Sequence, residues 1–592
     1  MYADIGTSVY YVPGILYGRF GARSAIFVLM TLAVFVLLCI KYAEVTWRYP
    51  EGGGVVNVAS QALHPFVGLL GGLLIMVDYF LTASLSGLSG VIYLSVLAPG
   101  IGGRAVGLTV VALCGLGILN AVGIRQSAAT TAVFAVAAGA GQLAVVAATA
   151  AYLGTSGIAA SFHSLASGSP ITPIALLEGY GAAFLAFSGL ESIAQLAPSM
   201  REPRRVIARR AMTGVVLMVA ITSPLLTLWS TTLLNANVDP NQFVSALGAH
   251  AAGEALAGYV AATGAILLVF ASNTAIIGTY HVLIALTRMG FMPRVLERRN
   301  RWRLTPHWAI LAAVAVPIAV VVITRGNVNL LGDLYAFGLL GTFVLTCLSL
   351  DIVRWREKRA WRPTTIAFFG VGVITTVLVL VAWLINIVSK TTATEFGAAL
   401  TLIGLCVGLV TYRSRRRQRP AVFPVPFRPQ RASESIAHAL GSRPPAVEAL
   451  IVLPHDPVAA DAVIRAGVHA AAGQGAVFLY RGNRYPHQHH ELLEVADPWL
   501  KDYIAQDSFA RAEAAARNAI PRRRYVYVPG SLPREIVGQV WRTVHPRKTI
   551  VTVEDEDMLP PASIDRIRRH ETDGAVVLEM ITSRLDEGRG LS

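Results

Sequence analysis

Charged residues are scarce in this sequence. Asp, Glu, Lys and Arg make up 14% of its 592 residues, whereas hydrophobic residues make up 54%. Soluble domains carry roughly 25% charged residues, so the deficit excludes an ordinary soluble protein for most of the chain and places much of it in lipid. The scarcity is uneven, because the sequence before residue 412 has long uncharged stretches and the sequence after it is rich in Arg, Asp and Glu. We therefore predict a membrane domain over 1–412.

Cysteine is also rare, and the first residues do not have the pattern of a cleavable signal peptide. Each of the four cysteines lies inside an apolar run, which argues against a disulfide framework or a metal site and predicts buried, inert thiols: Cys39, Cys114, Cys347 and Cys406. The first residues, Met1 to Asp4, lack the basic region of a cleavable signal peptide. We expect no cofactor and no enzymatic activity.

Apolar runs long enough to cross a bilayer recur along the first domain. A spanning helix needs about 20 apolar residues. Counting a shorter run at the start, the sequence predicts twelve spans, near 5–20, 24–46, 62–97, 105–123, 128–153, 173–198, 209–234, 254–287, 306–324, 328–352, 364–389 and 394–412. This is the pattern of a polytopic α-helical membrane protein.

Basic residues set the expected orientation. The loops near 201–210, 288–303 and 354–362 are rich in Arg, whereas the predicted loops 154–172 and 235–253 contain no Lys or Arg. Positive loops stay on the cytoplasmic side, so we expect both termini inside and a location in the cell membrane, inner or plasma. The net charge of +15 comes largely from such loops, and we therefore expect a lipid bilayer and no nucleic acid as partner.

The sequence after residue 412 changes character twice. Residues 413–446 are basic and Pro-rich and predict a linker. Residues 447–592 then alternate β-rich runs with helical stretches, which predicts a cytoplasmic soluble α/β domain built on a parallel sheet with helices on both faces. The expected strands are 448–454, 476–482, 524–530, 548–555 and 575–582, and the expected helices are 458–472, 499–519 and 532–543.

The sequence gives little indication of a ligand for the domain 447–592. No phosphate-binding loop follows its strands, although the loop 529–535 could hold an anion at a helix N-terminus or simply cap that helix. His487, His489 and His490 fit a solvated loop better than a metal site. A small nucleotide ligand and a homodimer formed through the tail are the partners left open for this domain.

Three acidic residues lie in apolar surroundings within the first domain: Asp4, Asp78 and Glu191. Charge inside a membrane is costly and usually functional. Three carboxylates from three spans suit a monovalent cation or protons, because oxygen anions replace lost hydration and can titrate. Protonated acids that only join helices by hydrogen bonds are the alternative. Asn273 is also placed inside a span, where a packing hydrogen bond is the favoured role.

Two segments indicate interrupted helices, DIGTS at 4–8 and FSGLES at 187–192. Glycine beside hydroxyl residues permits unwinding, and the freed carbonyl groups can then coordinate a cation. The two segments fall in the first and sixth spans, which are equivalent positions in two five-span halves. That placement is typical of inverted-repeat transporters, whereas a lone Gly-Ser pair could equally mark a close helix contact.

These motifs carry a family resemblance. The segments DIGTS, YPEGGG at 49–54, VDYFLT at 77–82 and GLES at 189–192 resemble the amino acid–polyamine–organocation (APC) superfamily, most closely the potassium importers of the KUP and KimA types. The resemblance covers residues 1 to about 412 and implies a LeuT-like fold of inverted five-helix repeats. Regulatory tails similar to universal stress proteins occur in this superfamily.

The resemblance also implies a cation site. The positions that match KimA-type cation ligands are Asp4, Tyr11, Asp78, Thr82, Ser188 and Tyr335, with Glu191 as the proton-coupling residue. Ser188 replaces an expected Thr and keeps the oxygen. Amino acid carriers usually have Gly-x-Gly where this sequence has Asp4-Ile5-Gly6, and an Asp there would repel a substrate carboxylate.

The sequence thus predicts a secondary transporter that takes up potassium or a similar monovalent cation together with protons. An amino acid or amine permease of the same fold, or a membrane sensor without transport, are the alternatives. Only three residues precede Asp4, so we expect the natural chain to begin upstream of Met1, with roughly ten or more further residues that complete the first span.

Overall fold

A computed structural model describes residues 2–49, 54–123, 128–166, 171–196, 204–234, 237–298, 300, 303, 305–356, 363–418, 430–431, 447–471, 473–482, 503–528, 535–552, 567–572 and 575–580. Contacts within the chain divide it into two compact units, Met1–Arg419 and Pro420–Ser592. The predicted linker lies largely outside the described residues, as do loop residues 529–534 and the three histidines at 487–490.

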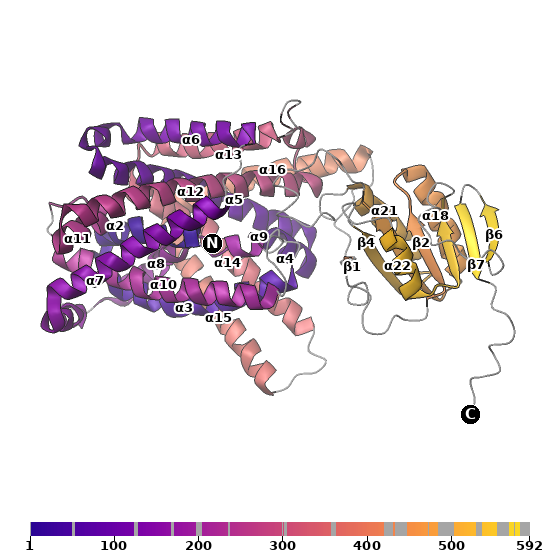
Figure 1. Ribbon diagram of the computed structural model, residues 1–592, viewed down its shortest axis with the longest axis horizontal. Helices are drawn as coiled ribbons and strands as arrows, with labels where there is room; N and C mark the ends of the chain where they lie inside the picture. The colour runs from indigo at the N-terminus through magenta and orange to yellow at the C-terminus, as the bar shows by residue number, and fades with distance from the viewer. Residues whose placement is uncertain are drawn as a thin grey trace. The chain divides into compact units, whose positions relative to one another are not determined.

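The first unit is helical (Figure 1). Its N-terminal half contains α1 (Tyr2–Ile5), α2 (Ser8–Phe20), α3 (Ser24–Arg48), α4 (Gly54–Ala62), α5 (Pro65–Leu97), α6 (Ala105–Val122), α7 (Ala128–Ala166), α8 (Pro173–Ala183) and α9 (Ser192–Leu196). Its C-terminal half contains α10 (Arg204–Leu233), α11 (Phe243–Ala252), α12 (Glu254–Arg288), α13 (His307–Ile323), α14 (Val328–Arg356), α15 (Pro363–Ser389) and α16 (Thr391–Gln418).

Ten helical segments among the described residues are long and apolar enough to cross a membrane. One of them, Ser8–Thr46, contains α2 and most of α3, which a 3₁₀ turn at Gly21–Arg23 separates. Helix α13, with 17 residues, falls just below the length required. These segments show a polytopic α-helical membrane protein, while the count of twelve spans stays a prediction.

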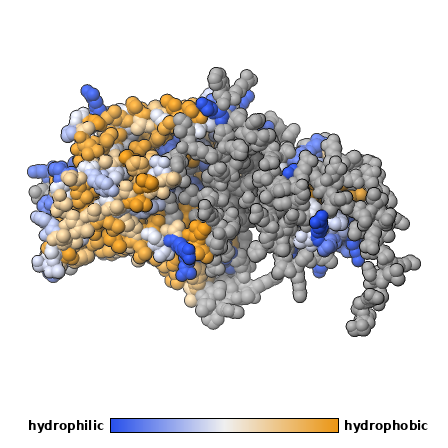
Figure 2. Space-filling view, in the orientation of Figure 1, coloured by the Kyte–Doolittle hydropathy of each residue, from blue (hydrophilic) through white to orange (hydrophobic). Residues whose placement is uncertain are grey.

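Apolar side chains cover much of the described surface of this unit, as the face drawn in Figure 2 shows. Large hydrophobic residues on the outer helices are widely exposed, including Ile118 on α6, Val136 on α7 and Val410 on α16, at 64%, 73% and 68%. Such exposure is unfavourable in water and favourable in lipid. Helices α5 and α12 pack along each other in the interior, and α14 packs against α5.

Two expectations about this unit were wrong. The predicted loop 154–172 is helical as far as Ala166, because α7 kinks at Gly154, where φ is 62°, and then continues. The predicted loop 235–253 contains α11. Two thiols also differ from the expectation: Cys39 and Cys347 are buried, but Cys114 and Cys406 are exposed on α6 and α16. An apolar run does not reveal which of its faces points to lipid.

The second unit contains a seven-stranded sheet in the order β1-β4-β3-β2-β5-β7-β6. The strands are β1 (Gln430–Arg431), β2 (Ala449–Leu453), β3 (Gly475–Arg481), β4 (Arg522–Val528), β5 (Lys548–Val551), β6 (Ile567–Thr572) and β7 (Ala575–Met580). The neighbours from β1 to β5 pair in parallel, whereas β7 is antiparallel to both β5 and β6. The sheet is therefore mixed, and a purely parallel sheet was wrong. Strands β1 and β6 were not predicted.

Helices lie on both faces of this sheet. Val463 of α18 (Pro457–Ala471) and Phe509 of α21 (Tyr503–Ala516) share one hydrophobic cluster with Ile451 of β2. Val537 of α22 (Glu535–Val544) packs on the opposite face with Leu450. Alternate residues of β2 therefore point into two separate cores, as a strand covered on both faces requires.

Candidate functional site

The first helix interruption lies between α1 and α2. Gly6 and Thr7 form a turn, and α2 begins at Ser8. The hydroxyl of Thr7 donates to the carbonyl oxygen of Asp4 at 2.6 Å, and that of Ser8 donates to the carbonyl of Ile5 at 2.8 Å. The hydroxyl residues next to Gly6 therefore satisfy backbone groups that the interrupted helix leaves unpaired.

The second interruption lies between α8 and α9. Helix α8 passes into a 3₁₀ turn at Phe184–Phe187, residues 188–191 form a turn, and α9 starts at Ser192. Gly189 has a φ of 92°, a conformation that side chains with a Cβ rarely adopt. A Cβ added to Gly189 would lie 2.9 Å from backbone and Cβ carbons of Asp4. The two interruptions, both expected from the sequence, are confirmed and lie against each other.

Side-chain donors lie within hydrogen-bond distance of four carbonyl oxygens at these interruptions, those of Asp4, Ile5, Gly6 and Ala186. The hydroxyl of Ser8 lies 2.6 Å from the carbonyl oxygen of Ala186, which links the two segments directly. The Nε2 atom of Gln142, on α7, donates to the carbonyl of Gly6 at 3.1 Å, and the Tyr2 hydroxyl donates to Oε1 of Gln142 at 2.8 Å. Side-chain donors thus occupy oxygens that the sequence suggested as cation ligands.

Helices α5 and α14 supply the opposite wall. The Thr82 hydroxyl lies 3.0 Å from the carbonyl of Asp78, one turn earlier on α5, and 2.5 Å from the hydroxyl of Tyr335 on α14. Gly338 of α14 allows this approach, because a Cβ there would lie 2.7 Å from the backbone nitrogen of Asp78. Because Gly338 has no side chain, α14 packs closely against α5, and Asp78 and Tyr335 lie near each other.

Carboxylates and hydroxyls from the two walls face one another. The hydroxyls of Tyr11 and Ser188 lie 3.2 Å apart. The side chains of Asp78 and Glu191 are electrostatic neighbours, with Tyr11 and Tyr335 beside them. Neither carboxylate oxygen of Asp78, nor Oε2 of Glu191, has a hydrogen-bond partner among the described residues. These are buried acceptors without donors, which is what a positively charged ligand would satisfy.

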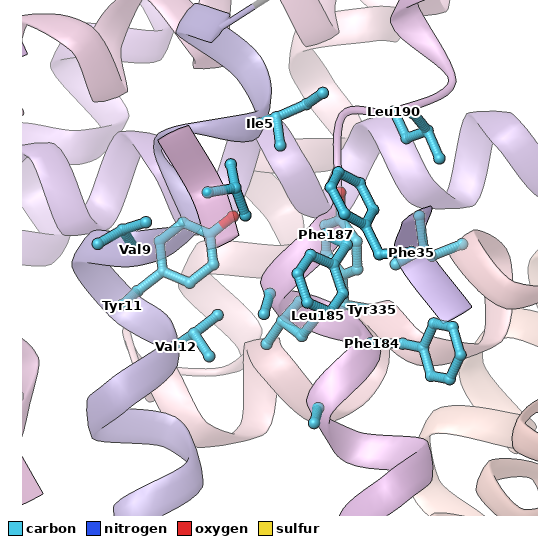
Figure 3. Packing of buried hydrophobic residues seen from close by; sticks show 14 of the residues in the cluster. Ile5, Val9, Tyr11, Val12, Phe35, Phe184, Leu185, Phe187, Leu190 and Tyr335 are labelled. Carbon is cyan, nitrogen blue, oxygen red and sulfur yellow. The ribbon is translucent and has the colours of Figure 1, made fainter. Parts of the chain in front are cut away.

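Apolar side chains enclose the carboxylates and hydroxyls of this site. Asp78 and Tyr335 have no exposed surface, and Glu191, Ser188 and Tyr11 are 2–3% exposed. Tyr11 and Tyr335 belong to one buried cluster, part of which Figure 3 shows, together with Phe35 of α3 and with Phe184, Leu185, Phe187 and Leu190 of the second interruption. In such surroundings two neighbouring carboxylates cannot both remain charged without a cation or a proton between them.

The structure brings all of the predicted site residues into one region. Asp4 is partly buried and lies beside Ser192 and Thr274, with Glu191 nearby. Sequence reasoning missed Gln142, whose signal would have been a lone amide inside an apolar span. It also missed Tyr42 on α3, which is buried beside Thr346 and near both Glu191 and Asp78. Nothing in the local sequence distinguishes Tyr42 from a packing tyrosine.

Asn273 plays the packing role expected for it. Its Oδ1 atom accepts a hydrogen bond of 2.7 Å from Nδ2 of Asn120. This contact joins α12 to α6, so Asn273 has a structural bond within the helix bundle.

Interrupted helices at these two positions are typical of inverted-repeat transporters, and comparison with known proteins agrees with that interpretation. A family model described as amino acid permease matches residues 1–409. The chain belongs to this family. The permease thereby belongs to the APC superfamily, as the resemblance of its motifs implied, and is a transporter.

One curated relative is a potassium transporter. The permease is 25% identical over 336 residues to the potassium transporter KimA of Bacillus subtilis strain 168. The match covers 55% of this chain and 54% of the relative, so the permease spans about half the length of the protein it resembles.

Proposed function

We propose that this permease is a secondary transporter that takes up potassium, or a similar monovalent cation, together with protons. The observation that carries the proposal is the pair of buried carboxylates, Asp78 and Glu191, of which both Asp78 oxygens and Oε2 of Glu191 lack a hydrogen-bond partner among the described residues. Hydroxyl oxygens from Tyr11, Ser188 and Thr82 lie around them. An all-oxygen site with a compensating negative charge suits a hard monovalent cation.

Charge balance assigns the two acids different roles. In the loaded site, ionised Asp78 compensates the cation and a proton neutralises Glu191, while Asp4 contributes as a neutral acid, because one monovalent cation balances one carboxylate. A cation on Asp78 without a proton on Glu191 would leave a buried negative charge, and so would a proton on Glu191 without a cation on Asp78. Only the site that holds both is neutral, which favours its change from one side of access to the other with cation and proton together.

The proposed coordinating residues come from the two walls that face one another. Asp4, Tyr11 and Ser188 belong to the interrupted helices, whereas Asp78, Thr82 and Tyr335 belong to α5 and α14. A carrier of this kind exposes its site alternately to the two sides by rocking one helix group against the other. A cation held between the two walls would be released when they separate.

The second candidate is an amino acid or amine permease, which the description of the matching family favours. Asp4 and Asp78 could bind the ammonium group of such a substrate. The carboxylate of an amino acid would need donors, but amide and hydroxyl donors at the first interruption are engaged with backbone carbonyls.

Uptake into proteoliposomes separates these candidates. Purified permease should accumulate rubidium, a tracer for potassium, when an inward proton gradient is imposed, and unlabelled potassium should compete. Radiolabelled amino acids and polyamines should not accumulate. Accumulation of an amino acid or amine without potassium competition would establish the second candidate, and no accumulation of rubidium under the proton gradient would contradict the first.

A further inference from the structure

The first unit contains a second group of charged side chains, away from the candidate site. Lys41 and Glu44 of α3 face Asp351 and Arg354 of α14, and Thr376 of α15 completes the group, which we call the charged clamp. Their side chains are at most 10% exposed. Charge buried in a membrane protein is costly unless it is fully paired.

The hydrogen bonds of the charged clamp run between helices. The ammonium group of Lys41 donates to Asp351 Oδ2 at 2.7 Å, to the Thr376 hydroxyl at 2.7 Å and to the carbonyl of Cys347 at 3.2 Å. These three bonds use all three of its protons. The Thr376 hydroxyl also lies 2.5 Å from Asp351 Oδ2, so α3, α14 and α15 meet in a closed triangle.

A second pair strengthens the same junction. Arg354 donates from Nε and Nη2 to the two oxygens of Glu44, at 3.2 Å and 2.5 Å, in the two-pronged geometry that is strongest for this pair. Its guanidinium also stacks over the ring of Phe368 of α15, 4.6 Å from the centroid. Arg48, one turn beyond Glu44, donates to the same carboxylate at 2.7 Å.

Asp351 of the charged clamp lies far along α14 from the site residue Tyr335. Asp351 follows Tyr335 by sixteen residues on one helix, which corresponds to about 24 Å along the axis. The charged clamp thus lies near the end of α14 that leads into the basic segment at 354–362, the end predicted to be cytoplasmic.

Helix α3 connects the charged clamp with both walls of the site. Its Phe35 stacks on Phe187, next to Ser188 in the second interruption, with ring centroids 4.5 Å apart. Its Tyr42 packs edge-on against Phe343 of α14, with centroids 5.6 Å apart. Helix α3 therefore contacts both the second interruption, which carries Ser188, and α14, which carries Tyr335.

We propose that the charged clamp is a conformational latch, which holds α3 against α14 and α15 and must loosen before the predicted cytoplasmic end of the permease opens. A buried ion pair adds little net stability compared with apolar packing, but its directional bonds are sensitive to small displacements. The group therefore suits a switch between two helix arrangements. The proposal rests on alternating access in a carrier, and it does not depend on which substrate is carried.

Cys347 provides a reporter that requires no substrate. Its side chain is buried and its carbonyl accepts the Lys41 bond. In a variant with Cys39, Cys114 and Cys406 replaced by serine, Cys347 should react slowly with a charged thiol reagent applied to inside-out vesicles. Lys41→Met and Asp351→Asn should raise that rate several-fold, and the exchanged pair Lys41→Asp with Asp351→Lys should restore protection.

If the charge variants fail to insert, a matched pair of variants that changes no charge tests the latch instead. Thr376→Val removes the hydroxyl that bridges Lys41 and Asp351, whereas Thr375→Val removes a buried hydroxyl that bonds to the carbonyl of Val371 in its own helix. Only Thr376→Val should speed the labelling of Cys347. Unchanged labelling in both, or an equal rise in both, would overturn the latch. Faster labelling of Thr376→Val, combined with no rubidium uptake by the wild type, would preserve the latch and remove the potassium proposal.

Discussion

At the scale of single residues, the oxygens around the site differ in whether a donor already occupies them. Backbone carbonyls of the interrupted helices accept bonds from Thr7, Ser8 and Gln142. The carboxylate of Asp78 has no such donor among the described residues. A cation entering the site would therefore find its strongest unsatisfied acceptors on side chains, and the interruptions serve to place those side chains.

Replacement of Glu191 by Gln should uncouple transport from protons. The amide keeps the size of the side chain but cannot gain or lose a proton. Any remaining rubidium uptake by Glu191→Gln should be independent of an imposed pH gradient, whereas wild-type uptake should rise with inside-alkaline gradients. A gradient response equal to that of the wild type would rule out Glu191 as the proton carrier.

The hydroxyl of Ser188 should matter as a neutral ligand. Loss of one polar contact in a buried site costs about 1 to 2 kcal/mol, so Ser188→Ala should raise the KM for rubidium roughly 5- to 30-fold. Ser230→Ala is a suitable control, because Ser230 is buried on α10 and bonds only to carbonyls of its own helix. Equal KM values for the two variants would remove Ser188 from the coordinating set.

At the scale of elements, glycine and hydroxyl residues made the helix interruptions predictable. DIGTS and FSGLES carry the local chemistry that ends a helix, and the structure has turns at both. The position of α11 and the continuation of α7 past Gly154 were not predictable, because uncharged Ala- and Ser-rich segments suit both loops and helices. The charged clamp was also missed, since its members lie on three helices separated by up to 335 residues.

Gly189 should tolerate no side chain. Its φ of 92° and the nearness of the Asp4 backbone both oppose a Cβ, so Gly189→Ala should separate the two interruptions and strongly reduce uptake. Gly115→Ala, where nothing lies within 4 Å of the added carbon, should leave uptake unchanged. The test compares the rubidium uptake rates of the two variants and the wild type, each normalised to the amount of folded protein measured by size-exclusion chromatography. Wild-type uptake by Gly189→Ala would contradict the tight packing described for this turn.

At the scale of the whole molecule, composition separated the apolar unit from the mixed-sheet unit. Four of the pairings within the sheet are parallel and match the strand–helix alternation. The antiparallel pair β6–β7 was missed, because IRRHET at 567–572 is polar and lacks a strand's apolar alternation. The likeness to universal stress proteins and a ligand of this unit remain predictions.

The second unit should show acid-sensitive stability through Glu513. Hydrogen bonds from Arg523 hold the pKa of Glu513 below its ordinary value of 4.5. A lowered folded-state pKa means that ionised Glu513 stabilises the fold above the unfolded-state pKa, and that this contribution disappears as pH falls through the folded-state value. The unfolding free energy of a fragment comprising 420–592 should therefore fall below pH 4.5 more steeply in the wild type than in Glu513→Gln. Parallel denaturation curves would show that the ion pair contributes nothing.

The most direct test of the proposed cation site is rubidium uptake by Asp78→Asn in proteoliposomes. The amide preserves shape and removes the charge that compensates the cation. The variant should insert and elute like the wild type, yet lose at least about tenfold in uptake, which corresponds to ~1.4 kcal/mol of lost stabilisation. Wild-type uptake of rubidium by a folded Asp78→Asn permease would contradict the cation site.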